Sequence, residues 1–271
     1  MSFDSQEISN ASGRPIFFYE FYWGQSRWFY NSSDRNLQLD GISDEYVAAP
    51  ITNDTFTFGG QEQEDFKIDM QADLPVPALF RGTPPSEPVR VVVLRKHADD
   101  LETTVFFAGR VNNVKRDDEG KATLFCSAGR SGRGGLRLTW SRTCPHMLYD
   151  SQCKVDREAF AVQTTITALS GNSFTIAAEA NADITYFNGG IIAWDADGNG
   201  TLEQRTIERG ISTTEFLIFG RSDGLSVGQA ITLYPGCNRR PETCNDKFNN
   251  MANYGGIAQM PGESPYGVNL F

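Results

Sequence analysis

Histidine, long apolar runs and the usual catalytic motifs are scarce in this sequence, and their scarcity narrows its chemistry. The 271 residues include only two histidines, His97 and His146, which stand in unrelated contexts. No nucleophile elbow, metalloprotease helix or phosphate-binding loop is present, so we expect a protein that is not an enzyme. No stretch approaches the ~18 uninterrupted apolar residues of a membrane span, so no membrane-spanning helix is expected.

Basic charge is also in short supply. The formal net charge is −10, which argues against a general nucleic-acid binder because phosphate binding requires clustered cations. The segment Met1–Glu7 is polar and acidic and does not resemble a signal peptide. We therefore expect folding in a reducing cytosol, where cysteine clusters bind metals more often than they form disulfides.

The fold class is predicted to be mainly β with little helix. Residues 15–30 are rich in aromatics and predict a hairpin that turns at Gly24-Gln25-Ser26. Because its aromatics fall on both faces, we expect burial on both sides or a subunit interface. The alternation in 66–70 is typical of a half-buried strand. Further strands are expected at 89–94, 103–114 and 121–127.

A second β unit is predicted after a Gly- and Arg-rich boundary at 128–138. Residues 164–178 predict a hairpin. Shorter strands are expected at 191–194, 202–208, 214–219 and 229–234, because Gly or Asp-Gly turn signals separate these segments. The proline-containing segment Leu74–Pro77 is expected to be a connection, because proline does not continue a helix or a central strand.

Four of the five cysteines form two pairs, Cys144 with Cys153 and Cys237 with Cys244, separated by more than eighty residues. Two distant pairs that close on one point would make a single four-thiolate centre. Their spacings are wider than ordinary zinc knuckles and miss the common ferredoxin patterns. Zinc, an iron–sulfur cluster, disulfides and unrelated buried thiols all remain open on this evidence. Cys126, in an apolar run, is expected to be a small core residue.

Basic residues flank the cysteines and are candidates for contacts to a metal centre. Arg142 and His146 flank Cys144, and Arg239 and Arg240 follow Cys237. Such groups would tune a net-negative cluster, whereas the alternative is that they are solvated loop charges. Cys144 with His146 could also form a thiol–imidazole pair, but no orienting partner is visible.

The acidic run at 195–203 contains a possible calcium turn. Asp195, Asp197 and Asn199 occupy the first, third and fifth positions of a calcium loop. Thr206 stands where that loop needs a bidentate Glu, and the flanks are predicted strands. An ordinary Gly-rich hairpin turn is therefore the main expectation.

With these residues in view, the chain resembles the tail-tip (hub) proteins of long-tailed bacteriophages. It is similar to the protein L type of lambda-like tails and to hub proteins of gene transfer agents and Mu-like siphophages. The resemblance is carried by CPHMLYDSQC at 144–153, PGCNRRPETC at 235–244, KFNN at 247–250 and NYGG at 253–256.

The resemblance implies that Cys144, Cys153, Cys237 and Cys244 ligate a [4Fe–4S] cluster. It implies a β-rich, ring-forming domain at 1–143 and a clamped region at 144–244 with a small β domain inserted at about 155–235. A tail at 245–271 is expected to dock on a partner.

The implied function is that of a structural component of the tail tip, or baseplate hub, assembled in the host cytoplasm and located in the virion. A homotrimer is expected to join the distal tail protein to the central hub or fibre protein, with the tape measure protein as a further neighbour. Two alternatives stay open, which are a zinc-stabilised binding module and a cell-wall peptidase that uses Cys144 as its nucleophile.

Overall fold

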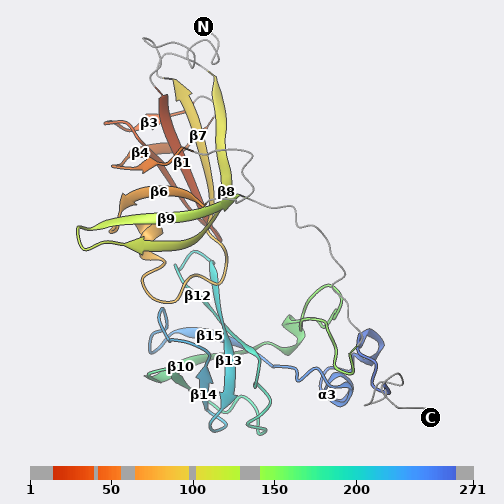
Figure 1. Cartoon of the computed structure of the whole chain (residues 1–271). Helices are drawn as coiled ribbons and strands as arrows, with labels where there is room; N and C mark the ends of the chain where they lie inside the picture. The colour runs from red at the N-terminus through yellow and green to blue at the C-terminus, as the bar shows by residue number, and fades with distance from the viewer. Residues whose placement is uncertain (1–14, 40–41, 56–64, 98–101, 129–140, 261–271) are drawn as a thin grey trace, which may run out of the picture. The chain divides into compact units, whose positions relative to one another are not determined.

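The chain folds mainly as β structure and divides into two compact units. The computed structural model describes residues 15–39, 42–55, 65–97, 102–128 and 141–260 (Figure 1). One unit comprises Met1–Ser131 with Asp195–Glu203, and the other comprises Gly132–Trp194 with Gln204–Phe271. The predicted mainly-β fold class is confirmed. The predicted boundary falls on residues 129–140, which lie outside the described residues.

One nine-stranded sheet organises the first unit, in the order β3-β4-β2-β1-β7-β8-β9-β6-β5. Neighbours pair antiparallel, except that β2 and β4 are parallel. The strands are β1 (Pro15–Trp23), β2 (Ser26–Asn31), β3 (Leu37–Gln38), β4 (Glu45–Ala48), β5 (Thr52–Asn53), β6 (Phe66–Gln71), β7 (Arg90–His97), β8 (Thr103–Arg116) and β9 (Lys121–Ala128).

The aromatic strand β1 is buried on both faces by its own chain. Tyr19 and Phe21 belong to the main core of the sheet. Phe18, on the other face, packs in a smaller cluster with Leu39 and Tyr46. The predicted hairpin and its two-sided burial are confirmed.

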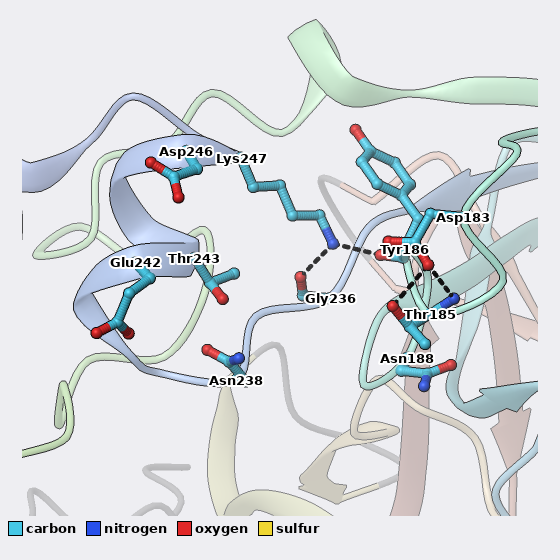
Figure 2. A pocket seen from close by; sticks show the side chains of 10 residues that line it. All are labelled: Asp183, Thr185, Tyr186, Asn188, Gly236, Asn238, Glu242, Thr243, Asp246 and Lys247. Atoms are coloured by element: carbon cyan, nitrogen blue, oxygen red, sulfur yellow. Dashed lines mark hydrogen bonds between the residues drawn. The ribbon is translucent and has the colours of Figure 1, made fainter.

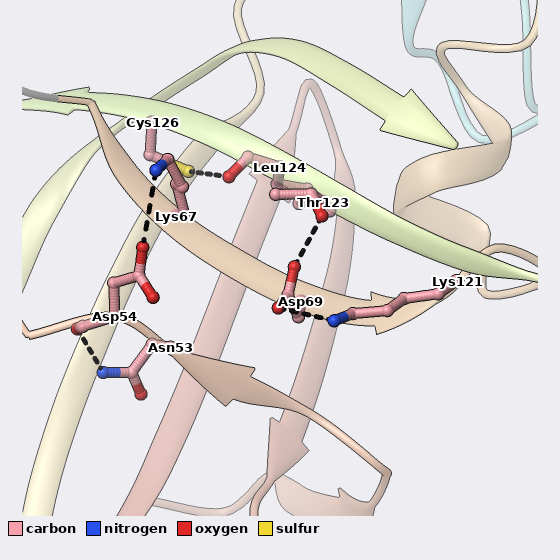
Figure 3. Close-up of polar contacts among 8 residues, drawn as sticks. All are labelled: Asn53, Asp54, Lys67, Asp69, Lys121, Thr123, Leu124 and Cys126. Atoms are coloured by element: carbon pink, nitrogen blue, oxygen red, sulfur yellow. Dashed lines mark hydrogen bonds and ion pairs between the residues drawn. The ribbon is translucent and has the colours of Figure 1, made fainter. Parts of the chain in front are cut away.

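Strand β6, paired with β9, has one face in the core and the other toward solvent (Figure 3). Ile68 and Met70 are buried, whereas the Asp69 carboxylate between them accepts hydrogen bonds from Thr123 Oγ1 at 2.6 Å and Lys121 Nζ at 2.8 Å. Cys126 is fully buried in the core, and burial raises the pKa of its thiol. The prediction that Cys126 is a core residue is confirmed.

The proline segment was expected to be a connection, and this expectation is wrong in one respect. Pro75–Ala78 forms a single helical turn, α2, with Val76 buried. Proline is tolerated in the first turn of a helix, where its missing N–H has no intrahelical partner to lose.

A closed six-stranded barrel forms most of the second unit, in the order β10-β11-β14-β13-β12-β15. Phe174, Trp194 and Phe216 fill its core. The strands are β10 (Val162–Ser170), β11 (Ser173–Ile176), β12 (Ile191–Asp195), β13 (Leu202–Gly210), β14 (Glu215–Ile218) and β15 (Ala230–Tyr234). The short helices are η1 (Glu158–Phe160), α3 (Pro241–Asp246) and η2 (Met251–Asn253). None of the described helices has the length and hydropathy of a membrane-spanning segment.

Candidate metal centre

The first cysteine pair sits in a loop that one carboxylate organises. Asp150 Oδ1 accepts the N–H groups of Gln152 at 2.9 Å and Cys153 at 2.6 Å, and Oδ2 accepts that of Met147 at 3.0 Å. These bonds, foremost the one from Cys153, hold the pKa of Asp150 below its usual range. The carboxylate therefore folds the segment between Cys144 and Cys153 into a compact turn.

The second cysteine pair lies in the segment that follows β15, the last strand of the barrel along the chain. Cys237 follows Gly236, and Cys244 lies on α3. An added Cβ on Gly236 would lie 1.9 Å from the backbone oxygen of Asn188, so only glycine allows this close crossing of two chain segments. The Cys144 N–H donates to the Arg239 carbonyl at 2.9 Å and joins the two cysteine segments.

All four cysteines line one cavity of about 290 Å³. His146, Arg239, Asn250 and Tyr254 also contribute to its wall. Every cysteine is a free thiol, so neither pair is a disulfide. Across the described residues, no group of three or more His, Cys, Asp and Glu side chains is placed to hold a metal ion.

Three of the four sulfurs face a nitrogen donor. The Arg239 N–H donates to Cys237 Sγ at 3.3 Å and the Gly255 N–H donates to Cys144 Sγ at 3.4 Å. Asn250 Nδ2 lies 3.8 Å from Cys153 Sγ. Cys244 Sγ instead donates to the Asn250 carbonyl at 3.3 Å. Such donors suit sulfurs that carry negative charge.

Burial opposes the ionisation of these thiols. It raises the pKa of Cys237 and of Cys244, and the neighbouring cysteines raise both further. Four thiolates crowded together would repel one another, so they need a bound cation to remain ionised. The four sulfurs could therefore act together as thiolates only with a cation bound among them.

The four flanking basic residues lie near the site in different ways. His146 and Arg239 line the cavity. The Arg142 side chain turns to the Met260 carbonyl, which its Nε reaches at 2.7 Å. Arg240 is exposed and contributes backbone bonds, since its carbonyl accepts the Cys244 N–H.

The possible calcium turn forms the connection between β12 and β13. Asp195 accepts N–H groups from Asp197, Gly198 and Gly200 of its own loop. Asp197 accepts the Asn199 N–H at 2.9 Å and the Ser26 hydroxyl at 2.5 Å. These bonds occupy the carboxylates with groups of their own unit, as in an ordinary hairpin loop.

Glu203 forms its hydrogen bonds within the first unit, to which residues 195–203 belong. It is 5 % exposed, and its carboxylate accepts the Ser86 N–H at 3.0 Å and the Ser86 hydroxyl at 3.0 Å. The Gln25 N–H donates to Thr201 Oγ1 at 3.1 Å. The turn thus has a structural task within this unit.

Lys247, just after α3, points into a second cavity of about 500 Å³ (Figure 2). Its ammonium donates to the Gly236 carbonyl at 2.8 Å and to the Tyr186 carbonyl, and it lies 4.2 Å from the centre of the Tyr186 ring. Burial lowers the pKa of Lys247 to about 8. Lys247 thereby joins the end of α3 to the barrel loop before β12.

Sequence reasoning missed Asp150, Asn250, Tyr254 and Gly255. All four lie in segments that carry the family resemblance, but a polar residue in a loop gives no periodic signal of its partner. Only the folded chain shows that residues 250–260 return to 141–144, 153 and 239. Residues 261–271 of the expected tail lie outside the described residues.

Comparisons with known proteins find similarity to one protein family over part of the chain and to one solved structure over nearly all of it. Residues 185–264 match the family described as "Phage conserved hypothetical protein BR0599". No curated protein matches the chain. One solved structure, "Virion of native gene transfer agent (GTA) particle", contains a chain with a TM-score of 0.75 and 17 % sequence identity. The alignment covers 97 % of this chain and 93 % of that one, so the chain shares that protein's fold.

Proposed function

We propose that the protein is a structural component of the tail tip of a phage-like particle, with a four-cysteine iron–sulfur centre that clamps its second unit. The observation that carries the proposal is that Cys144, Cys153, Cys237 and Cys244, from two segments far apart in the sequence, line one cavity. The fold shared with a chain of a gene transfer agent virion supports a virion location.

The residues present fit an iron–sulfur cluster. Four cysteine sulfurs are its ordinary ligands, and nitrogen donors near three of them would offset its negative charge. A tetrahedral zinc ion would draw all four sulfurs to about 2.3 Å from one point. A cluster of several atoms instead needs a cavity that can hold it, and all four cysteines line one cavity of about 290 Å³.

The centre's role is proposed to be mechanical. When bound, a cluster supplies four metal–sulfur bonds, and its binding free energy adds to the folding free energy. Cys144 and Cys153 precede the barrel and Cys237 and Cys244 follow it, so the clamp closes the chain where the barrel begins and ends. This suits a particle that must persist without chaperones.

The remaining features of the proposal concern assembly. The chain is proposed to form a homotrimeric ring between the distal tail protein and the central hub or fibre protein, with the tape measure protein nearby. We propose no catalytic role for Cys144, because the hydrogen bond that its sulfur receives in the described structure comes from the Gly255 N–H.

An absorbance spectrum with iron and sulfide assays, on protein purified without oxygen, tests the centre. We expect a band near ~400 nm with about four irons and four sulfides per chain. Cys153→Ser should lose the band, whereas Cys126→Ala, a matched loss of a thiol in the other unit, should keep it. Colourless protein with one zinc per chain would replace the cluster by a zinc clamp, and protein without metal would contradict the centre altogether.

A separate experiment tests the location. In cells that produce the particle, a tagged copy of the chain should be found by electron microscopy at the end of the tail, and light scattering should give a trimer mass for the purified chain. A label along the tail or on the capsid would contradict the tail-tip assignment and leave the metal question unaffected.

A further inference from the structure

The segment after α3 turns back across the four-cysteine site. The Ile257 N–H donates to the Ser141 carbonyl at 2.8 Å, and Arg142 Nε donates to the Met260 carbonyl at 2.7 Å. At the near end, Asn250 Nδ2 donates to the Cys153 carbonyl at 2.6 Å. We call residues 250–260 the strap, since both of its ends are bonded to the first cysteine loop.

Tyr254 lies where the two cysteine segments meet. Its hydroxyl donates to the Arg142 carbonyl at 2.6 Å and lies 3.3 Å from the Arg239 carbonyl. That second carbonyl also accepts the Cys144 N–H. A single phenol therefore contacts the loops that deliver Cys144 and Cys237, and it fixes their separation.

Gly255 brings the strap backbone against a sulfur. Its N–H donates to Cys144 Sγ at 3.4 Å. An added Cβ would lie 2.2 Å from Nε2 of His146, far inside any real contact distance. Any larger residue would have to displace the imidazole or lift the strap, and lifting the strap would break the bond to the sulfur.

The strap makes few apolar contacts besides these hydrogen bonds. Met251 and Ile257 are 44 % and 41 % exposed, and Ala252 and Ala258 are exposed as well. Because few apolar side chains are buried, the strap depends on hydrogen bonds to the cysteine loops. Those bonds persist only while the loops keep their positions, and four metal–sulfur bonds would fix those positions.

We propose that the strap is the positioning element of the metal centre, with Tyr254 and Gly255 as its positioning residues. Tyr254 sets the spacing of the two ligand loops, and Gly255 supplies an N–H donor to Cys144. In return, the bound metal holds the strap in place. This inference rests on the proposed metal centre.

Metal release from the loaded full-length protein to excess EDTA, without oxygen, tests the proposal. Tyr254→Phe and Gly255→Ala are each expected to speed release about ten- to a hundred-fold, on the basis that the usual loss of metal affinity when a ligand loses its partner is expressed in the release rate. Gln259→Ala is the control, because this exposed strap residue makes no hydrogen bond within the described structure. The control should release metal at the wild-type rate.

A rescue separates the clash at Gly255 from general damage. If the added methyl acts through His146, then His146→Ala combined with Gly255→Ala should release metal more slowly than Gly255→Ala alone. Release at the wild-type rate from both Tyr254→Phe and Gly255→Ala would overturn the proposal while leaving the metal centre standing. Protein that never binds metal would contradict the proposed function and this inference together.

Hydrogen exchange gives a second, independent measurement. Amides of 254–257 are expected to be protected in the loaded protein and to lose that protection when the metal is removed. Barrel amides such as those of β14 serve as the internal reference. Equal exchange of the strap in both states would overturn the proposed coupling.

Discussion

A single half-buried residue, Asp150, arranges with its carboxylate the loop that carries the first cysteine pair. It gathers three backbone N–H groups between Met147 and Cys153. An ionised acceptor of several N–H donors is more effective than a neutral one. The charge of Asp150 therefore matters as much as its shape.

Asp150→Asn should weaken metal retention, because it removes the charge and replaces one of the two oxygens that accept N–H groups by an amide NH2 group, which only donates. Bonds from N–H groups hold the pKa of Asp150 in the folded protein below its ordinary value. The stabilisation by the ionised carboxylate is therefore complete above about pH 3.9, the pKa of an unfolded Asp, and is lost only as the pH falls through the lower pKa of the folded state. The ratio of metal-release rates, variant to wild type, should therefore exceed one and stay constant from about pH 5 to pH 8. Asp118→Asn, at an exposed turn, should give a ratio of one. A ratio that drifted across this window would contradict the assignment.

Lys247 should make the stability of the folded chain rise with pH in the alkaline range. Burial lowers its pKa to about 8, below the ~10.4 of an unfolded lysine. Between these values the unfolded chain binds more protons, so the stability of the wild type relative to Lys247→Met should rise from pH 8 to pH 10. Thermal midpoints across that range measure it. The exposed Lys115→Met should show no such trend, and a flat difference for Lys247→Met would refute the prediction.

At the scale of elements, the crossing at Gly236 fixes β15 and the second cysteine segment against the barrel loop. Gly236→Ala would place a methyl carbon on the Asn188 carbonyl, and a backbone atom cannot swing aside as a side chain can. We expect a loss of at least about 1–3 kcal/mol of stability, the usual cost of overpacking. Denaturant unfolding measures it. The same change at Gly256, where the Arg142 carbonyl is nearest at 2.7 Å, should cost less, and equal losses would count against a special role for Gly236.

The regular elements were predictable from sequence where pattern and length were both strong. The alternation of Phe66, Ile68 and Met70 and the aromatics of β1 each indicate a strand without knowledge of its partners. The strands β3, β4 and β5 were missed, because two to four residues carry no readable period. The helix α3 was also missed, since Pro241–Asp246 is too short to show a helical period.

Of the candidate site, the four cysteines and two flanking basic residues, His146 and Arg239, were predictable from the sequence. Cysteine spacing is a chemical signal that survives in the sequence, whereas the partners of Asn250 and Tyr254 lie roughly a hundred residues away. Their roles depend on chain crossings that only the fold creates. The calcium-like turn shows the converse, since its spacing has a sufficient explanation in hydrogen bonds of the loop and of Ser26.

At the scale of the whole molecule, the four-cysteine cavity lies entirely within one of the two compact units. All residues that line its cavity belong to Gly132–Trp194 and Gln204–Phe271. The nine-stranded sheet and Cys126 belong to the other unit, with a core of their own. A cross-link stabilises the part of the chain whose ends it joins. Loss of the proposed metal cross-link should therefore lower the stability of the two units unequally.

Removal of the metal should therefore destabilise the barrel unit and spare the sheet unit. Cys153→Ser breaks the clamp, so hydrogen exchange should speed up in β10 to β15 and stay unchanged in β1, β7 and β8. Cys126→Ala opens a small cavity beside β6 and β9 and should show the reverse pattern, at a cost of about 1 kcal/mol for a lost buried group of this size. The two variants are matched losses of one thiol in different units, so each controls for the other. If Cys153→Ser loosened both units equally, the two would unfold as one cooperative body and the clamp would act on the whole chain.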